Sequence, residues 1–334
     1  MMLSIVVPYS KLSLFLLTFL ALPVHSVPKG NSAIVNKAAN ASRNGNSKVT
    51  TASDGSMILD KTVIINGLPI RYKVSAPPDQ FTTTSGIPGA SAQPKTTGAN
   101  GLNVLLHGDG GQSFTDFPNQ AVQNGLMGVV VLAPNNKRFW GGGSGLQRTD
   151  GEAHAAAVNS LIQDQLSQDV AFDPSKVFFT GVSGGSLLLS GFFVPAYGDD
   201  YKTGVLLNCG GLTPQVPVVN SSGMIANMKI HFQSTKKELT LLQPELPRAI
   251  SAYEKMATDA GLSKNQISKL QTVDNTPNGG HCEFDGKDFV SGVQLMSSNY
   301  ANIIGDNASG DIQGIGNVLT SVVGNEMLQF TGGK

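Results

Sequence analysis

The sequence predicts an α/β protein whose core is a doubly wound, mostly parallel sheet. Two observations support this fold class. Short apolar runs alternate along the chain with stretches of helical periodicity, and residues 176–189 have the pattern of a buried strand, a tight turn and a helix. The 334 residues suffice for one domain of roughly 250–280 residues. We place this domain at residues 57–302, followed by a C-terminal extension at 303–334.

The N-terminus, residues 1–26, has the pattern of a secretory signal peptide. Lys11 precedes an apolar run at 12–22, and residues 24–26 resemble a small-residue cleavage site. This run is too short to span a bilayer, and no later segment approaches ~20 apolar residues. We therefore expect a secreted chain with no membrane contact after signal removal; an N-terminal membrane anchor is the alternative. Residues 27–56 are mostly small and polar, which predicts a disordered or removed leader.

Charge and composition exclude several classes of function. Charged residues make up 14% of the chain, below the usual ~25%, and the net charge is zero. No basic stripe is present, so we do not expect nucleic-acid binding. The sequence shows no metal-ligand cluster and no phosphate-binding loop, and we therefore expect neither a metal nor another cofactor.

The first two strands are predicted at 57–65 and 70–74, antiparallel around the turn dipeptide Asn66-Gly67. Residues 76–100 follow as a long surface loop. Further strands are expected at 102–106, 128–132, 177–180, 203–207, 229–233 and 267–273, and helices at 115–125, 152–168, 186–193, 246–260 and 289–300.

Ser183 is the candidate nucleophile. It lies at the centre of Gly181-Val182-Ser183-Gly184-Gly185, a G-x-S-x-G pattern between a strand and a helix, which is the context of a nucleophile elbow. Glycines on both sides relieve steric conflict in so tight a turn. The N–H groups at the start of the helix favour negative charge that develops at the serine. The alternative is a plain Gly/Ser turn.

The loop after strand 102–106 is expected to supply an oxyanion hole. Its sequence is His-Gly-Asp-Gly-Gly at residues 107–111, and an HG loop in this place donates one backbone N–H while the residue after the nucleophile donates the other. We assign these donors to Asp109 and Gly184, with Gly110 as a less favoured substitute for Asp109. The alternative is a flexible glycine loop.

His281 is the candidate general base, because an imidazole can accept a serine proton near neutral pH. Of the five histidines, His25 lies in the signal peptide and His107 in the HG loop. His154 falls inside a predicted helix and His231 inside a predicted strand, so both are expected to be structural. Only His281 follows the last strand, in a Gly-rich loop. A surface histidine is the alternative.

An acid should orient the imidazole of this base. The chain order Ser, acid, His predicts that the acid lies in the loop after strand 229–233. Glu238 is the carboxylate nearest to the end of that strand. Lys236 and Lys237 beside it would equally fit a solvated charged turn. Asp274, at the end of the last strand, is the second candidate.

The only two cysteines, Cys209 and Cys282, predict one disulfide in an oxidising compartment. This bond would tie the Gly-rich loop that carries His281 to the sheet. Two buried free thiols are the alternative. Asn40, Asn220 and Asn307 each begin an N-x-S sequon and are possible glycosylation sites on surface loops.

Residues 103–289 resemble a known family. The segments that carry the resemblance are LLHGDGG, VLAP with the Trp-bearing loop after it, DGEAHAAAV, FDPSKVFFTGVSGGS and GGHCEF. The chain is similar to secreted α/β-hydrolases of the polyhydroxybutyrate-depolymerase and feruloyl-esterase group. This resemblance implies an α/β-hydrolase fold and ester hydrolysis by Ser183, His281 and an acid, which by position is Glu238.

The expected function is therefore a secreted serine hydrolase that cleaves carboxylic esters, either feruloyl or acetyl esters of plant cell walls or a polyester, through an acyl-enzyme. Trp140 and Phe139 are expected to line the acyl or aromatic pocket, unless this loop simply packs on the sheet edge. An alternative function is non-catalytic binding of a carbohydrate or polymer on the same scaffold. A peptidase or acyltransferase would share the triad.

Overall fold

The structure is a computed structural model that describes residues 47–116, 122–143, 145–305 and 307–333. The signal peptide, the sequon at Asn40 and most of the predicted leader lie outside these residues, and those expectations stay predictions.

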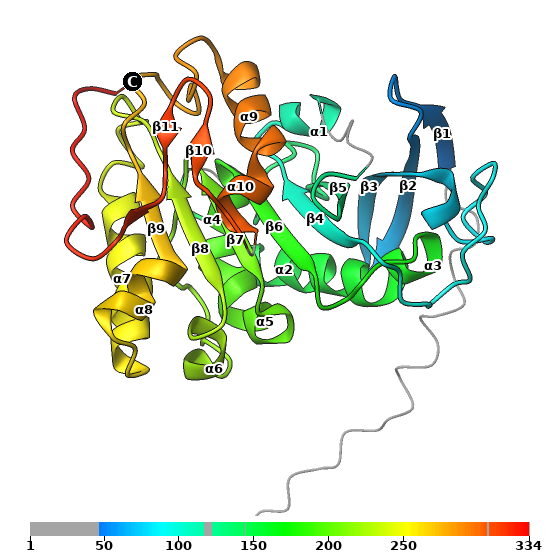
Figure 1. Ribbon diagram of the computed structural model, residues 1–334, viewed down its shortest axis with the longest axis horizontal. Coiled ribbons are helices and arrows are strands. Elements are labelled where there is room, and N and C mark those ends of the chain that lie inside the picture. Colours follow the sequence, from blue (N-terminus) through cyan, green and yellow to red (C-terminus); the bar gives the residue numbers. More distant parts are fainter. Residues whose placement is uncertain (1–46, 117–121, 144, 306, 334) are drawn as a thin grey trace, which may run out of the picture. The chain divides into compact units, whose positions relative to one another are not determined.

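The described residues form a ten-stranded sheet with the order β1-β2-β3-β5-β4-β6-β7-β8-β9-β12 (Figure 1). Neighbouring strands from β5 to β9 are parallel, and the sheet is antiparallel at both ends. The strands are β1 (Ser47–Thr51), β2 (Met57–Ile65), β3 (Leu68–Ala76), β4 (Gly101–Leu106), β5 (Leu126–Leu132), β6 (Val177–Val182), β7 (Gly204–Asn208), β8 (Lys229–Gln233), β9 (Gln271–Asp274) and β12 (Thr320–Ser321). The predicted α/β-hydrolase fold with an antiparallel N-terminal hairpin is confirmed.

The strand order reverses at β4, because the chain passes from β4 to β5 on one side and then to β6 on the other. In open α/β sheets ligands bind at such a switch point, outside the carboxyl ends of the strands. The HG loop follows β4 and the elbow follows β6, so the topology alone brings these two loops together. Every residue of β4 and β6 is buried, as expected for parallel strands covered on both faces.

Helices cover both faces of the sheet (Figure 1). One face carries α2 (Gly151–Ser160) with its continuation to Asp169, α4 (Gly184–Leu188) with its continuation through α5 (Val194–Tyr201), α6 (Ser221–Ile225), α7 (Glu245–Asp259) and α8 (Lys264–Leu270). The other face carries α1 (Gln112–Asp116), α9 (Phe289–Ser298) and α10 (Tyr300–Ile304). None of the helices in the described ranges combines the length and the apolar character needed to cross a membrane.

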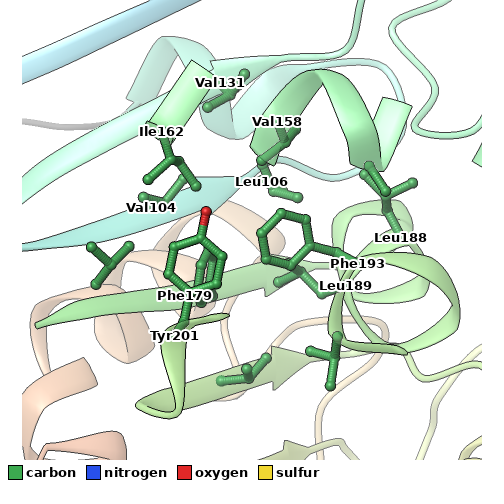
Figure 2. Close-up of a cluster of buried hydrophobic side chains, with 14 of the residues drawn as sticks. Val104, Leu106, Val131, Val158, Ile162, Phe179, Leu188, Leu189, Phe193 and Tyr201 are labelled. Atoms are coloured by element: carbon green, nitrogen blue, oxygen red, sulfur yellow. The ribbon is translucent and has the colours of Figure 1, made fainter. Parts of the chain in front are cut away.

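An aromatic cluster anchors the elbow strand to the helix that follows it (Figure 2). Phe179 on β6 packs against Phe193, with ring centroids 4.8 Å apart, and against Tyr201 at 5.0 Å. Val104 on β4 and Ile162 on the neighbouring helix complete the packing, and all five side chains are buried. Close-packed protein interiors resist local deformation, so we expect this packing to support the elbow rigidly.

The N-terminal hairpin is confirmed in detail. Strands β2 and β3 pair over their full lengths, ending at Ile65 opposite Leu68. Asn66 and Gly67 between them have φ values of 52° and 81°, the two positive values that a two-residue hairpin turn requires.

Three expectations about local structure are wrong in part. Residues 47–51 belong to the predicted leader but form β1, whose backbone pairs with the edge of β2; this pairing needs no apolar side chains. The helix expected at 115–125 is α1, which begins at Gln112, and residues 122–125 are not helical. The strand expected at 267–273 begins only at Gln271.

The strand expected at 267–273 begins late for a local reason that the sequence contains. Ser263 and Gln266 form a capping box, in which each side chain bonds the backbone N–H of the other residue. This interaction begins α8, so residues 267–270 are helical although their composition also suits a strand.

The C-terminal residues pack onto the domain. β12 adds to the main sheet by antiparallel pairing with β9, and a small hairpin, β10 (Asp311–Ile312) and β11 (Gly316–Asn317), precedes it. Further on, the amide of Thr331 donates to the carbonyl of Lys236 at 2.8 Å, and Gln243 donates to the carbonyl of Gly332 at 2.8 Å. The chain end therefore lies against the loop after β8.

A pair of carboxyl groups joins this C-terminal segment to α7. Glu254 on α7 shares a hydrogen bond with Glu326, and burial together with this bond raises the pKa of Glu254 to about 7. Lys264 lies near both groups and acts in the opposite direction on Glu254. The folded protein therefore binds the Glu254 proton more tightly than the unfolded chain does.

We predict that Glu254→Gln makes the protein more stable than the wild type above pH 8, by on the order of 1 kcal/mol after allowance for solvent screening. The stabilisation that the protonated pair gives is complete below the ordinary pKa of 4.5 and is lost as the pH rises through about 7. Urea unfolding of both proteins at pH 5 and pH 8.5 measures the difference. Parallel stability profiles for Glu254→Gln and the wild type would contradict the prediction.

Candidate active site

Ser183 occupies a strained turn between β6 and α4. Its backbone angles are φ 50° and ψ −111°, a conformation that non-glycine residues rarely adopt and that is found mainly at functional sites. The turn is fixed on both sides, since the amide of Ser183 donates to the carbonyl of Asn208 at 2.9 Å and the amide of Leu187 donates to the carbonyl of Ser183 at 3.1 Å. A side chain at Gly181 would lie 2.6 Å from Cα of Ser186, so the tight elbow requires glycine there.

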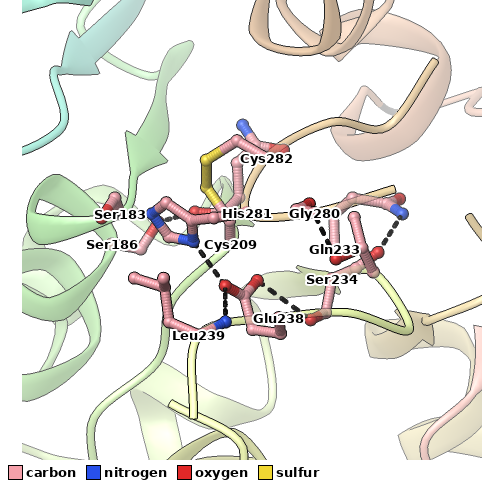
Figure 3. The surroundings of a disulfide bond; sticks show 12 residues. Ser183, Ser186, Cys209, Gln233, Ser234, Glu238, Leu239, Gly280, His281 and Cys282 are labelled. Atoms are coloured by element: carbon pink, nitrogen blue, oxygen red, sulfur yellow. Dashed lines mark hydrogen bonds and ion pairs between the residues drawn. A yellow bond between two sulfur atoms is a disulfide. The ribbon is translucent and has the colours of Figure 1, made fainter. Parts of the chain in front are cut away.

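The imidazole of His281 lies next to this serine. Nε2 of His281 is 2.9 Å from Oγ of Ser183, although the two residues are 98 positions apart in the sequence (Figure 3). The histidine comes from the loop between β9 and α9, where the amide of Gly280 donates to Oε2 of Glu283 at 2.7 Å. The ring is 18% exposed, so water and small substrates can reach it.

Glu238 contacts the other nitrogen of the imidazole. Its Oε1 pairs with Nδ1 of His281 and also accepts the amide of Leu239 at 2.8 Å. Oε2 accepts the hydroxyl of Ser234 at 3.3 Å. The Glu238 side chain is 0% exposed. A carboxylate on Nδ1 keeps the proton on that nitrogen and leaves the Nε2 lone pair directed at Ser183.

The structure distinguishes the two acids that the sequence left open. Asp274 does not reach the imidazole, because its Oδ2 accepts a hydrogen bond from Gln233 at 2.6 Å and its Oδ1 accepts the amide of Thr276 at 2.9 Å. The solvated-turn alternative for Glu238 is wrong as well. Lys236 and Lys237 are exposed while Glu238 is fully buried, so the charged turn is outside and the acid is inside.

Backbone hydrogen bonds join two loops of the site. One is the loop after β8 that carries Glu238 (the acid loop), and the other is the loop between β9 and α9 that carries His281 (the histidine loop). The amide of Lys236 donates to the carbonyl of Pro277 at 2.8 Å, and the amide of Lys237 donates to that of Gly279 at 3.2 Å. The hydroxyl of Thr235 donates to the carbonyl of Gly280 at 3.0 Å. These bonds set the separation of the two loops independently of the imidazole.

The predicted disulfide between Cys209 and Cys282 is confirmed (Figure 3). Cys209 follows β7, and Cys282 follows His281 directly in the chain; both are buried. The bond thus fastens the histidine loop to the strand beside the elbow strand. Cys209 and Cys282 have φ values of 46° and 60°. The backbone at each end of the bridge therefore adopts a conformation that is uncommon for residues other than glycine.

The HG loop lies against the elbow. A side chain at Gly108 would lie 3.5 Å from Cβ of Ser183. Gly110 already donates its amide to the carbonyl of Arg138 at 3.1 Å, which disfavours it as an oxyanion donor. No hydrogen bond to another described residue occupies the amide of Asp109 or Gly184, so both can serve the role expected of them, which stays a prediction.

The other described histidines are buried and structural in their contacts. Burial lowers the pKa of His107 and of His231 to about 4, so both are neutral near pH 7. Nε2 of His107 accepts the amide of Ala133 at 2.9 Å, and His231 lies between the side chains of Thr272 and Gln233. His154 likewise has a pKa lowered by burial.

The expectation that Trp140 lines the pocket is wrong. Its side chain is 0% exposed and packs between His107, with ring centroids 5.4 Å apart, and His154 at 6.1 Å. Phe139 is half-buried, and its backbone amide and carbonyl both bond the side chain of Asn135. Trp140 is instead buried between the HG loop and α2.

Phe289 is the aromatic residue beside the site. Its ring lies 6.1 Å from that of His281, and its edge would be 3.4 Å from a side chain at Gly108. Sequence reasoning placed Phe289 only at the start of the last helix. Its position a few residues after the histidine loop was the available signal.

One group of metal-ligating side chains occurs among the described residues, namely Cys209, His281 and Cys282. The two sulfur atoms are bonded to each other, and both nitrogens of His281 face Ser183 and Glu238. When the disulfide is formed, each of these ligand atoms therefore already bonds another group of the protein.

Two sequons lie within the described residues. Asn220 and Asn307 are both exposed, and the amide nitrogen of Asn220 donates to Asp199 at 2.9 Å. Their glycosylation stays a prediction.

Comparison with known proteins gives structural likeness only. No protein-family model matches the chain, and no curated protein matches it. A cold-adapted esterase from an Arctic intertidal metagenomic library is 13% identical, with a TM-score of 0.46 over 79% of this chain and 99% of that one. A ferulic acid esterase is 12% identical, with a TM-score of 0.41 over 72% and 95%. Acyl-protein thioesterase 2 of Zea mays is 13% identical, with a TM-score of 0.42 over 62% and 96%. The resemblance to the polyhydroxybutyrate-depolymerase and feruloyl-esterase group stays a prediction.

We predict that replacing both cysteines, Cys209→Ala with Cys282→Ala, lowers the free energy of unfolding by about 4 kcal/mol, because the bond closes a long loop and restricts the unfolded chain. The sequence separation is 73 residues. Urea unfolding of the oxidised wild type and the double variant, with the reduced wild type for comparison, measures the loss. Equal unfolding midpoints for oxidised and reduced wild type would contradict it.

Proposed function

We propose that this chain is a serine hydrolase that cleaves carboxylic esters. The observation that supports the proposal is the continuous line of contacts from Ser183 through His281 to the buried Glu238. A serine, an imidazole and a carboxylate in this order form the constellation that activates a hydroxyl for nucleophilic attack. The strained elbow at Ser183 supports the same conclusion, because a structural turn gains nothing from such a conformation.

The proposed reaction has two halves. In the first, Oγ of Ser183 attacks the ester carbonyl carbon while Nε2 of His281 takes the hydroxyl proton. The amides of Asp109 and Gly184 hold the carbonyl oxygen as it becomes negative. The tetrahedral intermediate then collapses, and His281 gives its proton to the departing alcohol.

In the second half, water attacks the acyl-enzyme. His281 accepts a proton from the water molecule. The bond from the acyl carbon to Oγ of Ser183 then breaks, His281 returns the proton to Oγ, and the carboxylic acid is released. Glu238 stabilises the imidazolium form of His281 in both halves and keeps its ring in place.

For the substrate we propose the ester classes that the sequence resemblance implies, which are feruloyl or acetyl esters of plant cell walls, or a polyester. Phe289 beside His281 supplies an apolar surface that suits an aromatic or alkyl acyl group. We also propose that the chain is secreted. The N-terminal signal pattern and the buried disulfide support this, since disulfides persist mainly in oxidising compartments.

Non-catalytic binding on the same scaffold gains no support from the site. A binding protein has no need for an imidazole held between a serine and a buried acid. We therefore do not carry this alternative further.

We predict that Ser183→Ala lowers the rate of p-nitrophenyl acetate hydrolysis by at least about 10³-fold, because the residual site retains only binding and oxyanion contacts. Initial rates of both proteins on p-nitrophenyl acetate, methyl ferulate and a 3-hydroxybutyrate ester test the activity and the substrate class together. A fluorophosphonate probe should label the wild type on Ser183 and leave the variant unlabelled. Equal rates in the two proteins, or no labelling of the wild type, would refute the proposed function.

A second prediction separates the two candidate acids. Glu238→Gln should lower kcat by about 10³–10⁴-fold, because the imidazole loses the group that fixes its tautomer. Asp274→Asn is the matched control and should keep kcat within about threefold, since its partners are Gln233 and Thr276. Steady-state kinetics of the two variants and the wild type on p-nitrophenyl acetate measures these changes in kcat. A larger loss in Asp274→Asn than in Glu238→Gln would mean that the acid is misassigned.

A further inference from the structure

Arg148 makes a two-pronged ion pair with Asp109 of the HG loop. One guanidinium nitrogen is 2.9 Å from Oδ1 of Asp109, and the other is 2.8 Å from Oδ2. The same two nitrogens donate to the carbonyls of Trp140 at 2.8 Å and of Gly145 at 2.7 Å. The side chain of Arg148 is 2% exposed and that of Asp109 is 23% exposed. The guanidinium is thus an internal cation whose partners come from three separate positions in the chain.

The carboxylate of Asp109 lies directly against the elbow. A side chain built at Gly184 would collide with Oδ1 of Asp109, so the carboxylate fills the space beside that Cα atom. Gly184 and Asp109 are also the residues whose amides are assigned to the oxyanion hole. A negatively charged side chain therefore lies beside the place where the substrate oxygen becomes negative.

An unpaired carboxylate in this position would oppose catalysis. Charges a few ångströms apart interact strongly where water is largely excluded, and a like charge raises the energy of the developing oxyanion. The guanidinium behind Asp109 cancels that charge. It also fixes the orientation of the carboxylate, because both oxygens are engaged at once.

We propose that Arg148 is a positioning residue for the oxyanion hole, which neutralises Asp109 and holds the HG loop at the distance from Gly184 that the reaction needs. This inference rests on the proposed function, because it concerns the same reaction. Arg148 does not touch the substrate; it acts through Asp109. Nothing in the sequence pattern identified it, since it lies in the Gly-rich loop 39 positions after its partner.

An arginine is required by the geometry. Its planar fork reaches both carboxylate oxygens and two backbone carbonyls, whereas a lysine ammonium is a single point charge on a flexible stem. Arg148→Lys should therefore keep the charge balance and lose the orientation. Arg148→Met should lose both and leave Asp109 unpaired.

The test compares single and double variants on p-nitrophenyl acetate. We expect Arg148→Met to lower kcat by about 100-fold, comparable with losing one oxyanion donor, and to change KM less than about threefold. Arg148→Lys should fall between this variant and the wild type. Adding Asp109→Asn to Arg148→Met removes the unpaired charge and keeps the backbone amide, so kcat should recover by about tenfold. Removing both charges can also restore folding, so the recovery supports the proposal only if Arg148→Met and the double variant unfold at the same temperature.

The control is Arg71→Met. Arg71 makes a similar two-pronged pair with Asp60 on the N-terminal hairpin, 2.8 and 2.7 Å in length, and the variant should keep kcat within about twofold. Thermal unfolding of every variant identifies any that fails to fold.

The outcomes separate this inference from the proposed function. If the wild type neither hydrolyses the ester nor reacts with a fluorophosphonate, the proposed function fails and the inference falls with it. If the wild type is active and Ser183→Ala is not, but Arg148→Met keeps kcat within about threefold, only the inference is overturned. It is also overturned if the double variant is folded and recovers nothing relative to Arg148→Met.

Discussion

The contact between Glu238 and His281 is the interaction on which the site depends. It joins the loop after β8 to the loop after β9, and it sets which nitrogen of the imidazole faces Ser183. Burial of an acid is costly unless its oxygens find partners, and here Ser234, Leu239 and His281 supply them. The acid is therefore stable in this place only when the histidine loop is folded over it.

Three further constraints hold that arrangement without using the imidazole. Backbone bonds from Lys236 and Lys237 fix the spacing of the acid and histidine loops, and the disulfide fastens the histidine loop to the end of β7. The C-terminal segment bonds to the acid loop through the amide of Thr331, which donates to the carbonyl of Lys236. Catalytic groups that must keep their positions to within about half an ångström need such support from their surroundings. The serine receives it from the buried β6 strand and the aromatic packing beneath the elbow helix.

Much of this could be predicted because the signals are local. The G-x-S-x-G turn, the NG hairpin and the short apolar runs each depend on a few neighbouring residues, and their order along the chain limits a parallel sheet to few topologies. The errors occurred where a local signal was weighed wrongly or was absent. The capping box at Ser263 was present and outweighed the strand pattern. For β1, the stabilising partner is the backbone of another strand, which composition does not reveal.

The sequence by itself determined the fold class, the position of the serine turn, the late histidine and the pairing of the only two cysteines, because each follows from residue type and order. Only the tertiary structure decided between Glu238 and Asp274, removed Trp140 from the pocket, and brought Phe289 and Arg148 to the site. These outcomes depend on which side chain points inward from a loop and on contacts between residues far apart in the sequence, such as Ser183 and His281, which are 98 positions apart. No pattern along the chain encodes that direction, since it is set by packing against segments that are distant in the sequence.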